Sequence, residues 1–321
     1  MALFMQSERM VPAPRHSLQG LTVFERGWLS SNNILIHAAP GEAGATLIDS
    51  GHVNHAEMTV QLVRHALGDQ ALAQLVNSHL HSDHCGGNAA LQAAFGMPVC
   101  IPPGQAEAVR AWDEERLSYK ASGQRIDMFS INRTLSFGEP LRAGGREWQV
   151  LAAPGHDPHS AMFFDAEHGV LISADALWQD GFGVVFPEVV GEPGFDDVAE
   201  VLERIAALPV RVVIPGHGAP FTDVAAALAR ARSRLAAFRT EPARHIRYAA
   251  KVFIKYHLME ERQMAWPALL SWARTTPLML DAWSRHDPVG VRSFDVWVHA
   301  LVAEMVARGA LAVQDDVVMD L

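Results

Sequence analysis

Short apolar runs separated by polar and glycine-containing turns dominate the first two thirds of the chain. Between several of these runs, apolar side chains recur with helical spacing and stop at Gly or Pro, at residues 55–68, 87–96 and 196–209. This alternation predicts an α/β layered domain over residues 15–224. The runs that we interpret as strands cover residues 33–38, 45–50, 71–79, 148–154, 161–165, 170–175 and 210–217.

The last hundred residues follow a different pattern, with helical spacing and little strand signal. They end in two short apolar segments on either side of Asp315 and Asp316, which is typical of a β-hairpin. Helices followed by a hairpin outline a winged helix, so we predict a helical, winged-helix-like C-terminal domain at residues 225–321. The expected helices cover residues 223–239, 243–259, 266–275 and, after a polar break, 293–309.

Charge is divided unevenly between these two predicted domains. Residues 225–321 hold 13 Lys and Arg against 10 Asp and Glu, whereas residues 1–224 hold 13 against 26. An acidic body disfavours a protein that coats nucleic acid, because it repels the phosphate backbone. We therefore rank nucleic acid below a small molecule as the binding partner.

The compartment is constrained by two further features. Cys85 and Cys100 are the only cysteines, which excludes a disulfide scaffold and fits a reducing environment. The N-terminal stretch lacks the apolar core of a secretory signal, and no window stays apolar for about 18 residues. We expect a cytoplasmic protein that does not enter a membrane.

The segment from Asn77 to Asn88 concentrates imidazole and carboxylate groups between a predicted strand and a predicted helix. On an extended backbone, alternation would place His79, His81 and Asp83 on one side. His84 would turn in beside Asp83 as the helix begins. An isolated His-x-His pair is often an accident of a polar loop, so this segment needs support from elsewhere in the chain.

Three more strand ends provide that support. His156, Asp175 and His217 each lie at the end of a predicted strand, the two histidines in Pro-Gly-His sequences. Imidazole and carboxylate on convergent loops suit a borderline divalent cation, and a carboxylate such as that of Asp175 can bridge two cations.

With these motifs in this order, the sequence resembles the metallo-β-lactamase superfamily, including glyoxalase II and lactonase-type hydrolases. The resemblance covers residues 79–217 and implies an αββα metallo-β-lactamase sandwich. It also implies two divalent metal ions, zinc in the first place with iron or manganese as alternatives, and a supporting role for Asp49 behind a ligand histidine. By this resemblance His79, His81 and His156 hold the first ion, Asp83, His84 and His217 hold the second, and Asp175 bridges them.

The implied activity is hydrolysis of a thioester, ester or lactone by a hydroxide that bridges the two metals. Asp83 is the expected catalytic residue, because it is placed to accept or orient the proton of the water. Trp178 stands where signal-quenching lactonases carry Tyr, which weakens the lactone prediction. The bridging Asp175 argues against drug hydrolysis, because true metallo-β-lactamases lack it.

Two other activities stay open. One is a metal-dependent ribonuclease or phosphodiesterase, and the other is a mononuclear iron persulfide dioxygenase, a branch that keeps the same histidine string. The basic stretch from Arg230 to Lys255 fits a solvated helix face or, alternatively, a cationic rim for an anionic tail. A homodimer through the C-terminal region is compatible with the resemblance. We expect residues 112–131 and 178–194 to build the substrate pocket.

Overall fold

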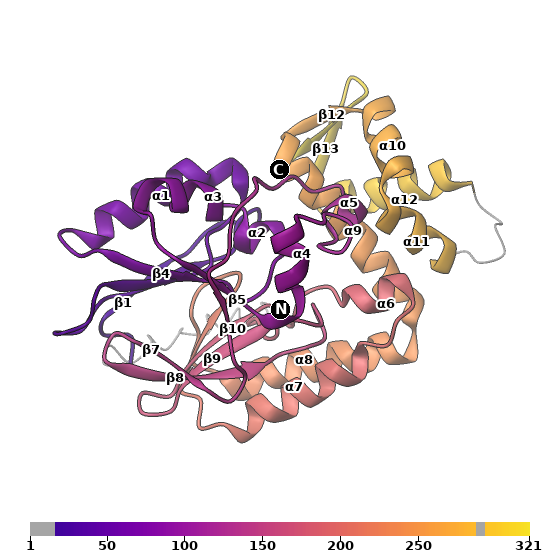
Figure 1. The fold of residues 1–321 in the computed structure, drawn as a ribbon. Coiled ribbons are helices and arrows are strands. Elements are labelled where there is room, and N and C mark those ends of the chain that lie inside the picture. The colour runs from indigo at the N-terminus through magenta and orange to yellow at the C-terminus, as the bar shows by residue number, and fades with distance from the viewer. Residues whose placement is uncertain (1–16, 287–292) are drawn as a thin grey trace, which may run out of the picture.

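Two β-sheets pack face to face at the centre of the molecule, and helices cover their outer faces (Figure 1). The computed structural model describes residues 17–286 and 293–321, so the predicted domain start at residues 15 and 16 lies outside the described residues. Within these residues one sheet has six strands and the other five. The predicted αββα sandwich is confirmed.

The first sheet mixes antiparallel and parallel pairing. Strands β1, β2 and β3 are antiparallel, whereas β3 to β6 are parallel and are connected by helical segments on the outer face. In spatial order the strands are β1 (Leu21–Phe24), β2 (Asn33–Ile36), β3 (Ala45–Ile48), β4 (Leu72–Val76), β5 (Val99–Ile101) and β6 (Arg133–Thr134).

The second sheet is antiparallel except at one edge, where β10 and β11 run parallel. The parallel pair brings the ends of these two strands to the same edge, which later positions two site residues. In spatial order the strands are β11 (Val212–Pro215), β10 (Val170–Ala174), β9 (Ala161–Asp165), β8 (Arg146–Ala152) and β7 (Pro140–Ala143).

Alternation along the strands explains the layers. Ile34 and Ile36 of β2 face the second sheet, whereas Leu35 between them packs in the cluster that contains Val60 and Leu91. Those two residues belong to α1 (Ala56–Leu67) and α3 (Asn88–Phe95), which cover the first sheet. The second sheet is covered by α7 (Phe195–Ala207) and α8 (Val224–Thr240). The shorter helical segments are η1 (Val53–His55), α2 (Ser82–Cys85), η2 (Pro103–Gln105), α4 (Ala106–Ala111), α5 (Tyr119–Ser122) and α6 (Phe186–Val190).

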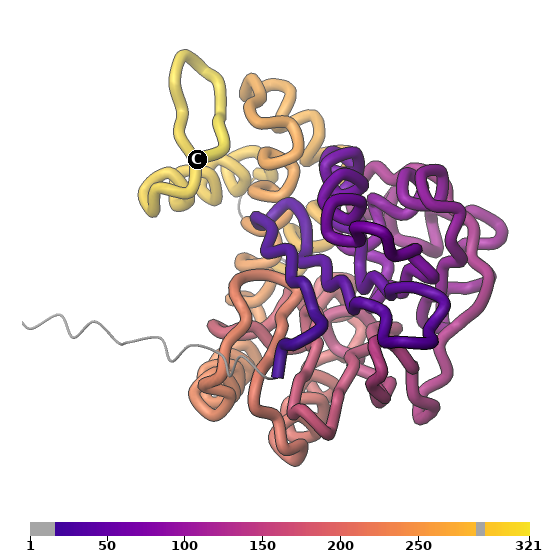
Figure 2. The backbone as a smooth tube through the Cα atoms, turned by 90° about the vertical axis from the view of Figure 1, so that its left-hand side faces the viewer, coloured from indigo at the N-terminus to yellow at the C-terminus, as the bar shows by residue number. Residues whose placement is uncertain are grey.

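The C-terminal region is mainly helical and ends in the predicted hairpin. Asp315 and Asp316 have φ of 49° and 62°, which is the backbone that a two-residue hairpin turn requires. The hairpin, yellow in Figure 2, extends away from the sandwich. The winged-helix assignment itself stays a prediction. The elements are α9 (Pro242–Glu261), β12 (Gln263–Ala265), α10 (Trp266–Thr275), α11 (Pro277–His286), α12 (Phe294–Ala307), β13 (Leu311–Gln314) and β14 (Val317–Asp320).

One expectation about this region is wrong. Much of the predicted polar break is the helix α11, which buries Leu278, Met279 and Ala282 against the other C-terminal helices. The helix begins at Pro277, and proline is tolerated at the first position of a helix because an N–H there needs no partner. The rest of the break, residues 287–292, lies outside the described part of the chain.

Candidate metal centre

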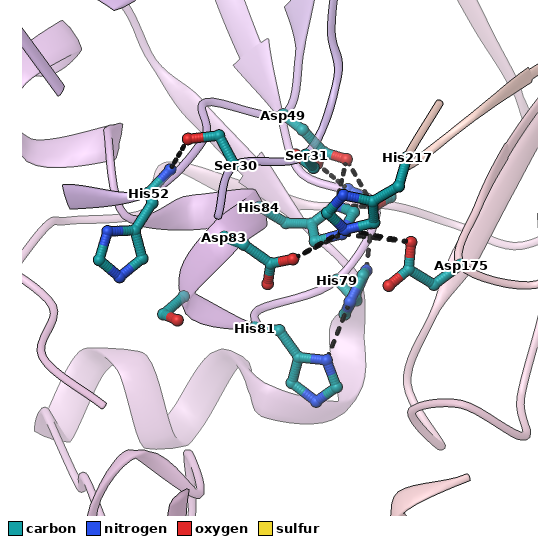
Figure 3. Close-up of polar contacts among 12 residues, drawn as sticks. Ser30, Ser31, Asp49, His52, His79, His81, Asp83, His84, Asp175 and His217 are labelled. Carbon is teal, nitrogen blue, oxygen red and sulfur yellow. Dashed lines mark hydrogen bonds and ion pairs between the residues drawn. The ribbon is translucent and has the colours of Figure 1, made fainter. Parts of the chain in front are cut away.

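The seven predicted ligands lie together at one edge of the sandwich, in segments that follow strand ends. Figure 3 labels all of them except His156. His79 follows β4, His156 follows β8, and Asp175 and His217 follow the parallel pair β10 and β11. Their ligand atoms form two groups, within each of which the atoms lie no more than 4.8 Å apart. The first group contains His79, His81 and His156, and the second contains Asp83, His84, Asp175 and His217.

The backbone around Asp83 differs from the prediction. His81 is extended, with φ −67° and ψ 151°, but the next four residues form the short helix α2. Asp83 is therefore part of a helical turn, and the expectation that it shares a side with His79 and His81 is wrong. The turn directs Asp83 and His84 together toward the second group instead.

Three imidazole nitrogens make up the first group. His81 Nδ1 lies 3.1 Å from His79 Nε2 and 2.8 Å from His156 Nε2. Nitrogens bound to one tetrahedral zinc at about 2.0–2.1 Å each would lie about 3.3 Å apart. The spacing of the three rings is thus close to what a single cation requires.

The second group combines two carboxylates with two imidazoles. Asp83 Oδ2 lies 3.0 Å from His217 Nε2, and His84 Nε2 lies 3.5 Å from Asp175 Oδ1. The other oxygen of Asp175, Oδ2, lies 3.2 Å from His156 Nε2 in the first group. Asp175 therefore faces both groups, as a bridging carboxylate would.

The hydrogen-bond partners of two histidine rings direct the other ring nitrogen of each into the site. His156 Nδ1 donates to the carbonyl of Val184 at 2.6 Å, so a neutral ring presents the Nε2 lone pair to the site. Likewise, His84 Nδ1 donates to Asp49 at 2.8 Å, which directs His84 Nε2 toward the carboxylates of Asp83 and Asp175. A divalent cation would take the place of the protons that otherwise lie between these nitrogens and carboxylate oxygens. The donor set therefore fits two metal ions.

The pKa values of these side chains reflect burial and crowding. Burial lowers the pKa of His81 to about 4, with His156 beside it acting in the same direction. Burial would also lower the pKa of His84, but the carboxylates of Asp175 and Asp83 raise it well above its ordinary value. For Asp83 burial acts upward, and His84 and His217 overcome it and lower the pKa to about 2. Asp83 thus stays ionised and His81 stays neutral near pH 7, the forms that bind metal.

Asp49 supports the loop from behind, in the position that the sequence predicted. Its Oδ2 accepts from His84 Nδ1 at 2.8 Å and from the Ser78 hydroxyl at 2.7 Å, and its Oδ1 accepts from the Ser78 amide at 2.7 Å. These contacts fix the orientation and tautomer of His84.

At two positions the backbone passes so close to a predicted ligand that only glycine fits. A Cβ on Gly216, in the second Pro-Gly-His sequence, would lie 2.2 Å from Asp175 Oδ1. A Cβ on Gly183 would lie 2.3 Å from His156 Nδ1. Any side chain at either position would displace a predicted ligand.

A cavity of about 600 Å³ opens onto the two groups. Trp28 stacks on His217 with ring centroids 5.2 Å apart, and Phe186 lies 4.5 Å from the ring of His81. Residues 122–124 and 178–180 contribute to its lining, as expected, and Trp178 donates to Asp175 Oδ1 at 3.1 Å.

One whole wall of this cavity was not predicted from the sequence. It is a face of α9, whose residues recur there at helical spacing. Tyr256 is the key contact, because its hydroxyl lies 3.1 Å from Ser82 Oγ in the metal-binding loop. The periodicity of α9 was visible in the sequence, but nothing in it indicated which face meets the strand ends. The wall residues are Tyr248, Lys251, Val252, Phe253, Lys255, Tyr256, His257, Met259 and Glu260.

The basic stretch is largely neutralised within the chain. Arg232 pairs with Glu203 across the surface, for example, and Arg247 and Lys251 share Glu304. These ion pairs favour the solvated-face interpretation over a rim for an anionic tail. The remaining pairs are Arg230 with Asp180, Arg239 with Asp196, and Lys255 with Asp320.

The other candidates have ordinary roles. Cys85 is buried, and burial raises the pKa of its thiol well above the usual range, so it is an inert core residue. Phe182 is also a core residue, whereas Phe186 faces the site. No helix of the described residues combines the length and apolar character needed to cross a bilayer.

Comparison with known proteins agrees with this architecture. The family model of the metallo-beta-lactamase superfamily matches residues 26–217. Hydroxyacylglutathione hydrolase GloC of Haemophilus influenzae is 30% identical over 193 residues, which cover 55% of this chain and 81% of the relative. Hydroxyacylglutathione hydrolase of Methylococcus capsulatus is 29% identical over 143 residues, 44% of this chain and 46% of the relative. The chain thus spans about half the length of that relative and of several others with the same name.

A solved structure extends the likeness in fold to the C-terminal region. A metallo-beta-lactamase family protein from Thermus thermophilus superposes with a TM-score of 0.55 at 20% identity, covering 95% of this chain and 99% of its own. The C-terminal helices therefore belong to an arrangement that another protein shares.

Proposed function

Because the chain belongs to the metallo-beta-lactamase superfamily, we propose that it hydrolyses a small acyl substrate, a thioester foremost, with two metal ions held by the seven clustered residues. His79, His81 and His156 would hold one ion, Asp83, His84 and His217 the other, and Asp175 both. The observation that carries the proposal is Asp175, with one oxygen toward each group. Zinc is the proposed metal, since four-coordinate imidazole and carboxylate sites suit it.

Two such ions would supply a water of lowered pKa and would stabilise the negative charge that develops on the carbonyl oxygen. The net reaction adds water across the acyl bond: oxygen joins the carbonyl carbon, the C–S bond breaks, and the thiol leaves with a proton.

Asp83 is the residue of the chain best placed to handle that proton. Its Oδ2 faces His217 and His84, while its Oδ1 forms no hydrogen bond with the described residues, and the side chain lines the cavity. The low pKa keeps Asp83 ionised near pH 7, so its carboxylate can accept a hydrogen bond from the attacking water and orient it.

The walls of the cavity favour an acyl substrate over a polyanion. Trp28, Phe186 and Phe253 offer apolar surface beside the metal groups, which suits a hydrocarbon chain and excludes water. The basic residues of α8 and α9 that might have drawn nucleic acid are mostly paired with carboxylates.

The test is a panel of thioesters, esters and lactones assayed with zinc-loaded protein before and after chelation. We expect chelator-sensitive thioester hydrolysis that falls by about 100-fold or more in Asp83→Asn, within the range for loss of a general base. A fully metallated protein that hydrolyses no member of the panel would refute the proposal.

A further inference from the structure

A second polar cluster lies in the cavity wall, apart from the metal groups. Glu260 of α9 lines the cavity with its side chain only 9% exposed, and two histidines flank its carboxylate. His52 Nε2 lies 3.8 Å from one carboxylate oxygen and His257 Nδ1 lies 3.7 Å from the other. Both separations are too long for hydrogen bonds. Within residues 17–286 and 293–321, the Glu260 carboxylate forms no hydrogen bond and no ion pair with Lys or Arg.

His52 provides an independent sign that something is bound here. Its side chain is fully buried, and its Nδ1 accepts from the Asn54 amide at 3.2 Å, so the ring proton of the neutral form lies on Nε2. That Nε2 has no hydrogen-bond partner among the described residues and points toward Glu260. In Figure 3 the ring of His52 is turned away from the metal groups, to which no contact joins it. A buried donor such as His52 Nε2 that has no hydrogen-bond partner destabilises the fold.

Glu260 brings negative charge to this end of the cavity, although Arg125 also lies near His52. Glu260 is the second-last residue of α9, where the helix dipole presents its negative end. A buried carboxylate without a counterion is strongly unfavourable unless a cation joins it. The aromatic ring of Trp272, stacked on His257 at 4.1 Å, adds a further surface that a cation prefers.

The position relative to the metal groups sets a length. Tyr256, whose hydroxyl reaches Ser82 beside Asp83, lies one helical turn before Glu260. One turn of helix spans about 5.4 Å. We therefore choose an arm of about six atoms to test whether an acyl substrate at the metal groups reaches Glu260.

From these contacts we propose that Glu260, with His52 beside it, binds a protonated amine on the acyl arm of the substrate. The inference rests on the proposed acyl hydrolysis and narrows its substrate class to amino-acyl thioesters or esters with the ammonium group about six atoms from the carbonyl. His52 Nε2 donates to Glu260 when the amine draws the carboxylate in, and the apolar walls pack on the connecting chain.

The experiment compares two ligand pairs that differ only in an ammonium or a methyl group at the end of the arm. The first pair is the 6-aminohexanoyl and heptanoyl thioesters of N-acetylcysteamine, followed by hydrolysis. The second pair is N-methyl-6-aminohexanamide and N-methylheptanamide, followed by isothermal titration, because amides report binding whether or not the protein is a hydrolase. Proteins are wild type, Glu260→Gln and the matched control Glu261→Gln, whose carboxylate is the exposed neighbour. Melting temperatures verify that each variant is folded.

We expect wild type and Glu261→Gln to bind the amino amide at least about tenfold more tightly than the neutral amide, and Glu260→Gln to lose this ratio. The same ratio should appear in kcat/KM for the thioesters. Equal binding of both amides by wild type, or an amine preference that survives in Glu260→Gln, would overturn the site. A third zinc equivalent that disappears in Glu260→Gln would also overturn it, because His257, Glu260 and Glu261 are close enough to hold a metal. Amine-selective binding without thioester hydrolysis would support the site and refute only the proposed activity.

Discussion

The metal-binding loops and the helix α9 contribute to the same site in different ways. The loops supply all seven predicted ligands from strand ends, and α9 supplies none. Yet α9 contacts the loops behind both metal groups: Tyr256 meets Ser82 beside Asp83, and His245 accepts from the amide of Val185. The carbonyl before that amide, on Val184, is the one that holds His156. A region that resembles an appendage in the sequence therefore supports the ligands without binding metal.

Asp175→Asn removes the negative charge that faces both metal groups. Of the substitutions considered, it should lower hydrolytic activity the most. The isosteric amide keeps the shape but weakens metal binding on both sides, so we expect activity to fall by about 1000-fold, the equivalent of several kcal/mol of charge stabilisation. Elemental analysis should show fewer than two metals per chain. Full activity with two metals would contradict the bridging role.

His245 of α9 should make the stability of the protein depend on pH, which allows the contact between α9 and the loop at Val185 to be tested. Burial lowers its pKa to about 4 from 6.5, so below pH 6.5 the unfolded chain takes up a proton that the folded chain does not. Stability is therefore full above pH 6.5 and falls as pH drops to about 4, by about 3 kcal/mol from this residue at about 1.4 kcal/mol per pKa unit.

The measurement is the urea unfolding free energy of metal-free protein at pH 7 and pH 4.5. In His245→Gln the unfolding free energy should differ less between pH 7 and pH 4.5, because an amide oxygen can accept from the Val185 amide without titrating. An unchanged difference would show that the acid sensitivity comes from other groups.

Asp49→Asn tests support from within the sandwich. Loss of the charged acceptor for His84 should weaken zinc binding by about 10–100-fold, the usual effect of a residue that orients a metal ligand. The chain offers a matched control in Asp165, which accepts from His168 Nδ1 at the same 2.8 Å but lies away from the metal groups. Asp165→Asn should lower stability and leave zinc affinity intact. Equal loss of zinc affinity in both variants would mean that general destabilisation is responsible.

Tyr256→Phe should change zinc affinity less than the substitutions above. It removes one hydroxyl that bridges α9 and the metal-binding loop, worth about 1 kcal/mol, so zinc affinity should fall about fivefold. Tyr248→Phe removes a hydroxyl from the same cavity wall without touching the loop, and should leave zinc affinity unchanged. If the two variants behave alike, α9 does not support the loop through Tyr256.

The sequence allowed the metal groups to be predicted well because their residues are contiguous or end strands. Ligand type and strand-end position indicated a metal site, and the family resemblance implied the grouping of His79 with His156 and the place of Asp175 between the groups. The structure brings those side chains together. The turn at Asp83 was mispredicted, since a four-residue helix carries no periodicity of its own. The strands β1, β5, β6, β7 and β12 were also missed, because segments of two to four residues show too little alternation.

The cavity was less predictable for a physical reason. A wall formed by α9 depends on how the C-terminal helices dock on the sandwich, and this is decided by packing between residues far apart in the chain. Val184 and Val189 of the sandwich, for example, join the core of Ile246, Phe253 and Trp297. Glu260 and His52 are separated by more than half the chain, so no local pattern indicates that they meet.

The central claim, two metal ions at the seven-residue cluster, is tested most directly by titrating metal-free protein with zinc and measuring bound metal per chain. The account predicts two equivalents in the wild type, fewer in Asp175→Asn, and hydrolysis that appears as the second equivalent binds. A wild-type protein that saturates at one metal ion per chain, and is inert to thioesters when saturated, would contradict it.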